Sequence, residues 1–285
     1  MTNQRIVLRF LSRLGAVSLL TLGLVAGVQA PALAYSSATV VTESTRDYVA
    51  LGDSFTSGQG APPYALDGTA CLRSKSASYP SIAARLSAVL DTPYRLVANR
   101  ACSGASTADI PAQLIGVDSG TDLVTLTVGG IDAGSNVVLA ECAPDPEGQA
   151  CLDAIAFSVA QLGVLAPKLV GAYATVATAL PDAKIAVLSY PRQFKPKFSP
   201  LGDVLNSATD ALNAVIAGSV AAMATPRIHF VDASQEFAGH GIGSRVPFFA
   251  FDPTNPFALA NFHPNALGNS LGYTRALANE RMLRP

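Results

Sequence analysis

The sequence predicts an α/β domain in three layers, with a central parallel sheet of about five strands covered by helices on both faces. Short apolar, β-branched runs alternate along the chain with longer helix-like stretches. Gly, Pro, Asp and Ser gather in the connections that follow the strand-like runs. The chain has 285 residues, 49% hydrophobic and 14% charged, which suffices for one domain with a large core.

Each expected element follows from a local pattern, and no internal repeat or linker interrupts their order. Ligands of such sheets bind beyond the carboxyl ends of the strands, so functional residues are expected in the connections after strands. The expected strands are 48–51, 95–98, 123–128, 185–188 and 228–231. The expected helices are 80–90, 151–180, 203–223 and 265–282.

The first 34 residues have the pattern of a secretory signal peptide rather than of a folded element. Three arginines precede an apolar stretch over residues 14–28, and Ala32-Leu33-Ala34 offers a small-x-small cleavage site. An uncleaved membrane anchor is the alternative, but this apolar stretch is short for a membrane span. We therefore expect a secreted, extracellular protein, one domain over residues 35–285, and no membrane span after cleavage.

Charge and motif content narrow the classes of partner. The formal net charge is −1 and the chain has no basic run, which argues against nucleic acid as a partner. The three histidines and four cysteines show no zinc-ligand spacing. We expect neither a metal nor a cofactor, and a monomer.

Four cysteines, an even number in an exported chain, predict two disulfides. Three connectivities are possible, and we favour Cys71–Cys102 with Cys142–Cys151. The second pair would close the segment CAPDPEGQAC, whose prolines and glycine suit a tight surface loop.

Ser54 is the candidate nucleophile, because the segment YVALGDSFTSGQG places it two residues beyond a strand end, among glycines. A serine that caps a helix is the alternative. A nucleophilic serine needs a base, and the chain has three histidines. His229 lies within an expected strand and His240 in a loop, where structural roles suffice. His263 directly precedes Pro264 and the last expected helix, so it is the preferred base.

A second serine, Ser270 in GNSLG, formally matches the nucleophile elbow of α/β-hydrolases. It lies inside the last expected helix, with no strand directly before it. Those enzymes also need a histidine after the serine, and none follows residue 263. We therefore treat this match as chance.

Four blocks, GDSFTSG, ACSGAST, TVGGIDAG and NFHPNALG, resemble in order and spacing those of the SGNH (GDSL-type) hydrolases. The resemblance is strongest to secreted actinobacterial lipases and esterases. It implies a flavodoxin-like α/β/α fold, Ser54 as nucleophile and His263 as base. It also implies an oxyanion hole made of the backbone N–H groups of Ser54 and Gly104 with one asparagine side chain. With an ordinary histidine pKa of about 6.5, activity would rise through about pH 6–7.

Two positions depart from the family pattern. Ile131 stands where the family has the oxyanion-hole asparagine, and an isoleucine side chain cannot donate a hydrogen bond. The usual acid three residues before His263 is replaced by Ala260, whose backbone carbonyl we expect to orient the imidazole. Either the hole works with two backbone donors, or another amide replaces the third. The candidates are Asn99, Asn136 and Asn261.

The segment before His263 bears on the substrate. Residues 244–264 contain five phenylalanines and four prolines. They could form coil packed on the sheet edge or an apolar wall for an acyl chain. The resemblance implies a serine esterase or lipase, and this segment favours lipid or lipophilic esters. A carbohydrate O-acetyl esterase and a catalytically weakened lipid- or glycan-binding protein remain alternatives.

Overall fold

The structure is a computed structural model that describes residues 45–90, 93–255 and 257–284. The expected signal peptide, residues 1–34, lies outside the described residues.

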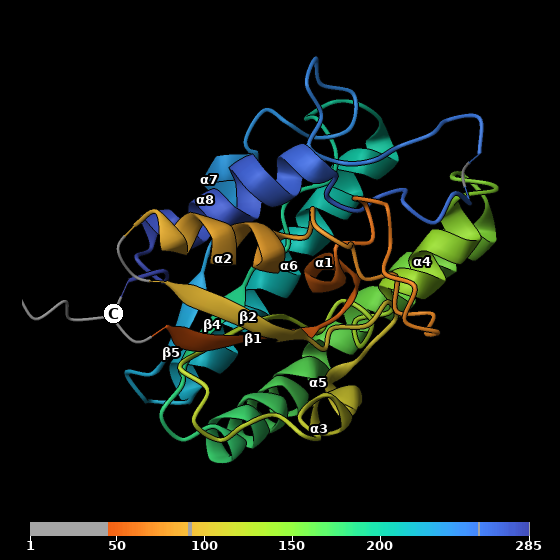
Figure 1. The fold of residues 1–285 in the computed structure, drawn as a ribbon. Helices are drawn as coiled ribbons and strands as arrows, with labels where there is room; N and C mark the ends of the chain where they lie inside the picture. The colour runs from red at the N-terminus through yellow and green to blue at the C-terminus, as the bar shows by residue number, and fades with distance from the viewer. Residues whose placement is uncertain (1–44, 91–92, 256, 285) are drawn as a thin grey trace, which may run out of the picture. The chain divides into compact units, whose positions relative to one another are not determined.

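A five-stranded parallel sheet forms the centre of the described chain (Figure 1). Its strand order, β2-β1-β3-β4-β5, is the flavodoxin-like order, in which the chain reverses direction across the sheet between β1 and β3. All five expected strands are present, each within two residues of its expected bounds. They are β1 (Arg46–Gly52), β2 (Tyr94–Asn99), β3 (Leu123–Thr127), β4 (Lys184–Leu188) and β5 (Ile228–Val231).

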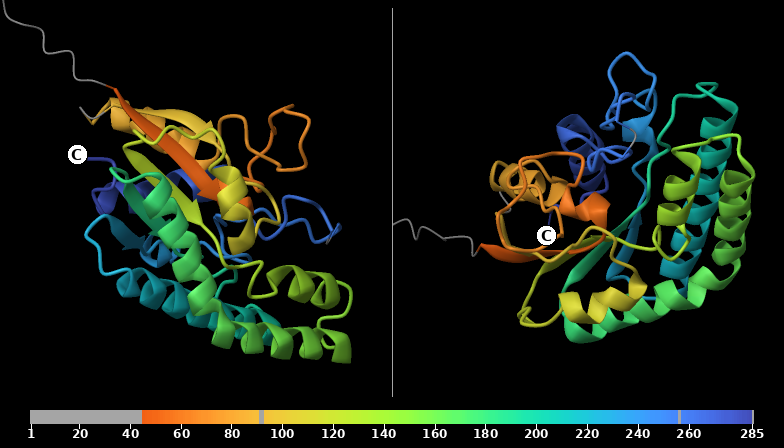
Figure 2. Two further views of the ribbon diagram at one scale, coloured as in Figure 1. Left: turned by 90° about the horizontal axis from the view of Figure 1, so that it is seen from below. Right: turned by 90° about the vertical axis from the view of Figure 1, so that its right-hand side faces the viewer.

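Helices cover both faces of this sheet (Figures 1 and 2). One face carries α2 (Tyr79–Ala88), α7 (Ser234–Phe237), the π-helical segment η2 (Gly268–Thr274) and α8 (Arg275–Asn279). The opposite face carries α3 (Ile110–Gln113), α5 (Gln149–Ala179) and α6 (Pro200–Ala222). The three-layer α/β/α architecture expected from the sequence is therefore confirmed.

Several short elements were not expected from the sequence. They are α1 (Ser54–Ser57), the 3-10 turn η1 (Thr107–Asp109), α3, α4 (Ser135–Cys142) and α7. Most have four residues or fewer, too short for a helical repeat to be read. The eight-residue α4 exposes apolar Val137 and Leu139 beside buried Val138, so it lacks the one-sided pattern of a surface helix.

The core lies between the sheet and its two helical layers. All five residues of β3 are buried, as expected for a strand covered on both faces. Two of them are threonines whose hydroxyls are satisfied inside the core. Thr125 Oγ1 lies 2.7 Å from the hydroxyl of Tyr48, and Thr127 Oγ1 donates to Asp53 over 2.7 Å. These buried hydrogen bonds connect β3 to β1 and to Asp53, the residue that follows β1.

Among the described residues, α5 is the one helix with the length and mean hydropathy (1.6) of a membrane span, by length and composition alone. Its C-terminal half contributes Leu165, Leu169, Tyr173 and Val176 to the core. Its N-terminal half exposes Leu152 and several other apolar side chains. The apolarity of α5 thus has a packing role over its second half.

Two disulfides, in the pairing favoured from the sequence, tie loops at the carboxyl edge of the sheet. Cys71 is bonded to Cys102, across 31 residues, and thereby holds the segment that follows β2. Cys142 is bonded to Cys151, across nine residues, and joins the end of α4 to the start of α5. Bridges of this kind typically contribute about 2–4 kcal/mol to stability.

Candidate active site

Ser54 lies at the carboxyl end of β1, at the switch point of the sheet, as the first residue of α1. The chain turns at Gly52, which has φ +113°, and a Cβ there would lie 2.0 Å from the carbonyl oxygen of Thr127. Asp53 caps α1, because its Oδ1 accepts the backbone N–H of Phe55 at 3.0 Å. The capping role considered for Ser54 therefore belongs to its neighbour.

Ser54 and His263 lie in hydrogen-bond contact although 209 residues separate them. Ser54 Oγ is 2.8 Å from His263 Nε2, and His263 Nδ1 is 2.7 Å from the backbone carbonyl oxygen of Asn261. A carbonyl only accepts hydrogen bonds, so the proton of the neutral imidazole is on Nδ1. Nε2 is then left to accept the Ser54 hydroxyl proton.

The expectation that the Ala260 carbonyl orients the imidazole is wrong by one residue. The carbonyl of Ala260 instead accepts the backbone N–H of His263, at 3.3 Å. Between them Phe262 adopts φ +61°, so the chain turns sharply and the imidazole reaches back to Asn261. This left-handed turn could not be read from residue spacing.

The histidine segment packs directly on the loop that follows Ser54. A Cβ on Gly60 would lie 2.4 Å from the carbonyl oxygen of Pro264 and 2.5 Å from that of His263. The neighbouring Gln59, 8% exposed, joins three segments: its Nε2 donates to the Leu259 carbonyl and its Oε1 accepts from Ser103 Oγ, both at 2.6 Å. No motif or spacing in the sequence indicates this role of Gln59.

A second hydrogen-bonded cluster lies under Ser54. The Asp53 carboxyl, 2% exposed, accepts hydrogen bonds from the hydroxyls of Thr127 and Tyr190. The Tyr190 hydroxyl in turn accepts the backbone N–H of Gly130 at 3.2 Å. The Tyr190 ring packs edge-on against Phe55, with centroids 5.1 Å apart. Tyr190 therefore connects the Ser54 turn to the glycine pair after β3, and sequence spacing gave no sign of this contact.

Burial shifts the titration of both ionisable groups next to Ser54. Desolvation lowers the pKa of His263 to about 4, opposed by its hydrogen bond to the Asn261 carbonyl. Desolvation raises the pKa of Asp53 to about 6, opposed by its three hydrogen bonds. His263 is thus a neutral base over a wider pH range than an ordinary histidine, and its titration lies below the pH 6–7 expected from the sequence.

The expected oxyanion hole has two backbone N–H groups available as donors but no asparagine side chain at the family's position. The backbone N–H groups of Ser54 and Gly104 have no acceptor among the described residues. Ile131, half-buried, occupies the position of the family's asparagine. The three candidate replacements lie elsewhere in the site: Asn99 Nδ2 donates to the Thr56 carbonyl at 3.3 Å, Asn261 Nδ2 donates to the Asn255 carbonyl at 2.9 Å, and Asn136 is exposed on α4.

The other serine and histidines of the sequence analysis lie apart from this contact. His229 is in β5, and the His240 ring binds the Val246 carbonyl through Nδ1 at 2.8 Å and stacks on Phe248. Ser270 lies within η2, with no strand directly before it. Within the described ranges, no group of three or more His, Cys, Asp or Glu residues is arranged to hold a metal ion.

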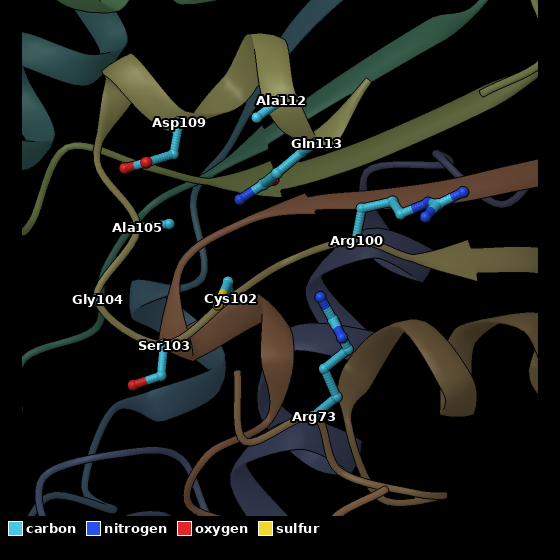
Figure 3. Close-up of a pocket in the computed structure, with 9 residues that line it drawn as sticks. All are labelled: Arg73, Arg100, Cys102, Ser103, Gly104, Ala105, Asp109, Ala112 and Gln113. Atoms are coloured by element: carbon cyan, nitrogen blue, oxygen red, sulfur yellow. The ribbon is translucent and has the colours of Figure 1, made fainter. Parts of the chain in front are cut away.

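A cavity of about 350 Å³ adjoins the Gly104 loop (Figure 3). In Figure 3 the backbone from Cys102 to Ala105 runs along one side of it, with Arg73 and Arg100 on the other. Neither Ser54 nor His263 lines it. The lining residues are Arg73, Arg100, Cys102, Ser103, Gly104, Ala105, Asp109, Ala112 and Gln113.

The phenylalanine-rich segment before His263 divides between the two roles considered for it. Phe248 and Phe249 are 3% and 2% exposed and pack on Phe237 in the core. Phe251 and Phe257 are 39% and 66% exposed. The segment is therefore partly core and partly surface.

The fold and the Ser54–His263 contact define a class of protein: an α/β/α hydrolase with a serine and a histidine at the carboxyl edge of its sheet. A family model described as GDSL-like Lipase/Acylhydrolase family matches residues 50–271. The chain belongs to this family and is a carboxylic ester hydrolase.

Proteins from Streptomyces are similar to the chain over most of their length. A lipase from Streptomyces rimosus is 37% identical over 260 residues, which cover 87% of this chain and 92% of that protein. The crystal structure of the extracellular lipase from Streptomyces rimosus matches with a TM-score of 0.72 and 36% identity, over 82% of this chain and 99% of that one. Phospholipase A1 from Streptomyces albidoflavus matches with a TM-score of 0.71 and 32% identity, over 83% and 99%.

Proposed function

We propose that the protein is a secreted serine esterase or lipase that hydrolyses lipid or lipophilic esters through an acyl-enzyme on Ser54, with His263 as the base. The observation that carries this proposal is the 2.8 Å contact between Ser54 Oγ and His263 Nε2, with Nδ1 bound to a carbonyl. Export is supported by the signal-like residues 1–34 and by the extracellular lipase from Streptomyces rimosus.

The reaction has two steps. His263 Nε2 takes the Ser54 hydroxyl proton as Oγ attacks the ester carbonyl, and the N–H groups of Ser54 and Gly104 stabilise the oxyanion. The alcohol leaves with the proton from Nε2, so an acyl-enzyme forms. Water then attacks the acyl group while Nε2 takes its proton, and Ser54 departs with that proton as the acid is released.

The orienting group of His263 in this mechanism is the carbonyl of Asn261 rather than a carboxylate. A carbonyl fixes the Nδ1–H tautomer, which is the first task of the acid in a catalytic triad. It stabilises the imidazolium less than a carboxylate does. Desolvation lowers the pKa of His263 despite its bond to this carbonyl, so the base is neutral at the pH of most extracellular fluids.

Lipophilic substrates are favoured by the aromatic surroundings of the base. The centroid of the Phe55 ring lies 5.3 Å from that of the His263 imidazole. Phe262, the residue directly before His263, contacts Phe194 and Phe251. The two similar proteins of known structure, a lipase and a phospholipase A1, point the same way.

Substitution of the two proposed catalytic residues tests this function. We expect Ser54→Ala and His263→Ala each to lower the turnover of p-nitrophenyl esters by several orders of magnitude without unfolding the protein, and the double variant to lose little more. Chain-length preference and activity on acetylated oligosaccharides separate a lipase from a carbohydrate O-acetyl esterase. Ester turnover by Ser54→Ala above a few per cent would contradict the assignment, and an inactive wild-type protein would favour a lipid- or glycan-binding role.

A further inference from the structure

The surface that begins at the proposed base combines exposed aromatic rings with positive charge. Phe262, adjacent to His263, contacts Phe194 and Phe251 with ring centroids 6.2 and 5.5 Å away. Phe194 stacks on Phe198 at 6.0 Å. The rings therefore run without a break from the half-buried interior beside His263 to two exposed edges, Phe198 and Phe251, which are 46% and 39% exposed.

Two more segments meet the same cluster. The backbone N–H of Lys195 donates to the carbonyl of Ile242 at 2.9 Å, which joins the loop before α6 to residues 241–246. The Phe198 ring lies over Gly243, where a Cβ would be 2.2 Å from it. Backbone hydrogen bonds between Ala250 and the residues 262–263 close the loop that carries Phe257, which is 66% exposed.

Three exposed cations belong to the same segments as these rings: Lys195, Lys197 and Arg245. None of their side chains forms an ion pair within the part of the chain that the structure describes. Two exposed acids adjoin the same segments and offset part of this charge: Asp203, in the first turn of α6, accepts the Lys197 backbone N–H at 3.0 Å, and Asp252 binds Thr254. Three cations and two acids leave a net positive charge. We call Phe198, Phe251, Phe257, Lys195, Lys197 and Arg245 the aromatic–cationic rim.

The neighbouring α4–α5 hairpin, on which Leu201 and Leu205 at the start of α6 pack, has a different charge. The α4–α5 hairpin also exposes apolar residues, such as Leu152 at 53%, but it carries Glu141, Asp145, Glu147 and Asp153 around its disulfide. An anionic surface would attract the rim and repel the hairpin. The two neighbouring surfaces thus differ in the sign of their charge, and this difference favours contact with an anionic surface through the rim.

We propose that the aromatic–cationic rim binds the surface of a lipid aggregate with anionic headgroups and so brings ester bonds of that surface to Ser54. Aromatic side chains enter the headgroup region of a bilayer, while lysine and arginine are drawn to its negative potential. The rim meets both conditions, and its innermost ring belongs to the residue before His263. This proposal rests on the proposed function only for its purpose, since adsorption itself requires no hydrolysis.

The test measures adsorption of the Ser54→Ala protein, which leaves the lipid intact, to sedimented vesicles. Vesicles of phosphatidylcholine alone are compared with vesicles in which about one third of the lipid is phosphatidylglycerol, at low and at high salt. We expect adsorption to the anionic vesicles, and weaker adsorption at high salt as the charges are screened.

Rim variants are compared with matched substitutions elsewhere. Lys195→Gln with Lys197→Gln should weaken adsorption about thirty-fold, since each basic residue near an anionic surface contributes about five-fold. The control, Lys168→Gln with Arg281→Gln, removes the same charge from exposed positions on α5 and after α8 and should change adsorption little.

The aromatic part of the rim is tested separately. Phe257→Ser should weaken adsorption about ten-fold. Its controls are Leu152→Ser on the hairpin and Val89→Ser, 74% exposed at the C-cap of α2, at the amino edge of the sheet.

Three outcomes would overturn the proposal: equal adsorption to both kinds of vesicle, no adsorption to either, or a loss with Leu152→Ser as large as that with Phe257→Ser. Thermal unfolding of each variant shows that it is folded, and the substituted side chains are all exposed. Turnover of a soluble short-chain ester by the protein with Ser54 intact is measured separately. A protein that hydrolyses this ester but ignores anionic vesicles would contradict the rim proposal alone.

Discussion

Ser54 and His263 share one hydrogen bond, but the molecule holds the two residues in different ways. On the serine side, the Asp53 carboxyl accepts three buried hydrogen bonds, from Phe55, Thr127 and Tyr190. These partners come from α1, β3 and the segment after β4, so they fix the turn from several directions. Little of this geometry could change without leaving a buried polar group unsatisfied.

On the histidine side, the imidazole has one orienting bond, to the Asn261 carbonyl, and its segment is held by close backbone packing. Gly60 permits that packing, and Gln59 adds a hydrogen bond to the Leu259 carbonyl. The loop that leads into this segment also carries exposed phenylalanines. The nucleophile is thus fixed by the core, whereas the base is fixed by a loop that also forms the surface around the site.

The largest effect is expected where the two sides touch. Gly60→Ala would put a methyl group 2.4 to 2.5 Å from two backbone oxygens of the histidine segment and so displace His263. A displacement of this kind costs about 100-fold in turnover. Gly171→Ala is the matched control, since Gly171 lies in α5 with nothing within 4 Å of its added Cβ. Steady-state kinetics on a soluble ester should separate the two variants, and a fully active Gly60→Ala protein would refute the packing account.

A smaller loss is expected on the serine side. Tyr190→Phe keeps the ring against Phe55 but removes the hydroxyl that links Asp53 to Gly130, so kcat should fall about ten-fold with KM little changed. Stability should fall by about 1–3 kcal/mol. The control is Tyr173→Phe, because the Tyr173 hydroxyl is buried with no partner among the described residues. If kcat of Tyr190→Phe matched that of Tyr173→Phe, the hydroxyl would have no positioning role.

The smallest effect is expected at Ile131, and it is a gain. If the oxyanion hole has only its two backbone donors, Ile131→Asn should raise the turnover of short-chain esters by up to about ten-fold, with KM changing less. This is below the 10²–10³ effect of removing an evolved donor, because the new amide is not preorganised. Initial rates under saturating ester decide the point. Unchanged or lower kcat in a folded variant would mean that the third donor comes from elsewhere and that the isoleucine has another role.

Sequence and structure agree most closely where the signal is local. The strand before Ser54, the glycines around it and the block containing His263 were visible within short segments. The residues that position them were not: Tyr190 lies 137 residues from Asp53, and Gln59 lies 200 residues from Leu259. The exchange of the Ala260 carbonyl for that of Asn261 depends on the positive φ of Phe262, which no residue type at that position announces. Long-range hydrogen bonds and unusual backbone conformations exist only after folding.

The protonation state of His263 depends on its burial, which the sequence does not show. An ordinary histidine titrates near pH 6.5, but the burial of His263 lowers its pKa to about 4. Because the protonated imidazole cannot accept the Ser54 proton, activity is lost as the pH falls through the pKa of the free enzyme. The acid limb of kcat/KM should therefore lie well below pH 6.

Labelling with a fluorophosphonate tests the central claim, that Ser54 is the nucleophile and a carbonyl-oriented His263 its base. Ser54 Oγ attacks phosphorus and displaces fluoride, and peptide mapping locates the adduct while the labelling rate is followed from pH 3 to 8. We predict a single adduct on Ser54, a rate with a midpoint near pH 4, and no labelling of His263→Ala on the same time scale. An adduct on Ser270, or a rate on Ser54 that neither falls at acid pH nor depends on His263, would contradict the account.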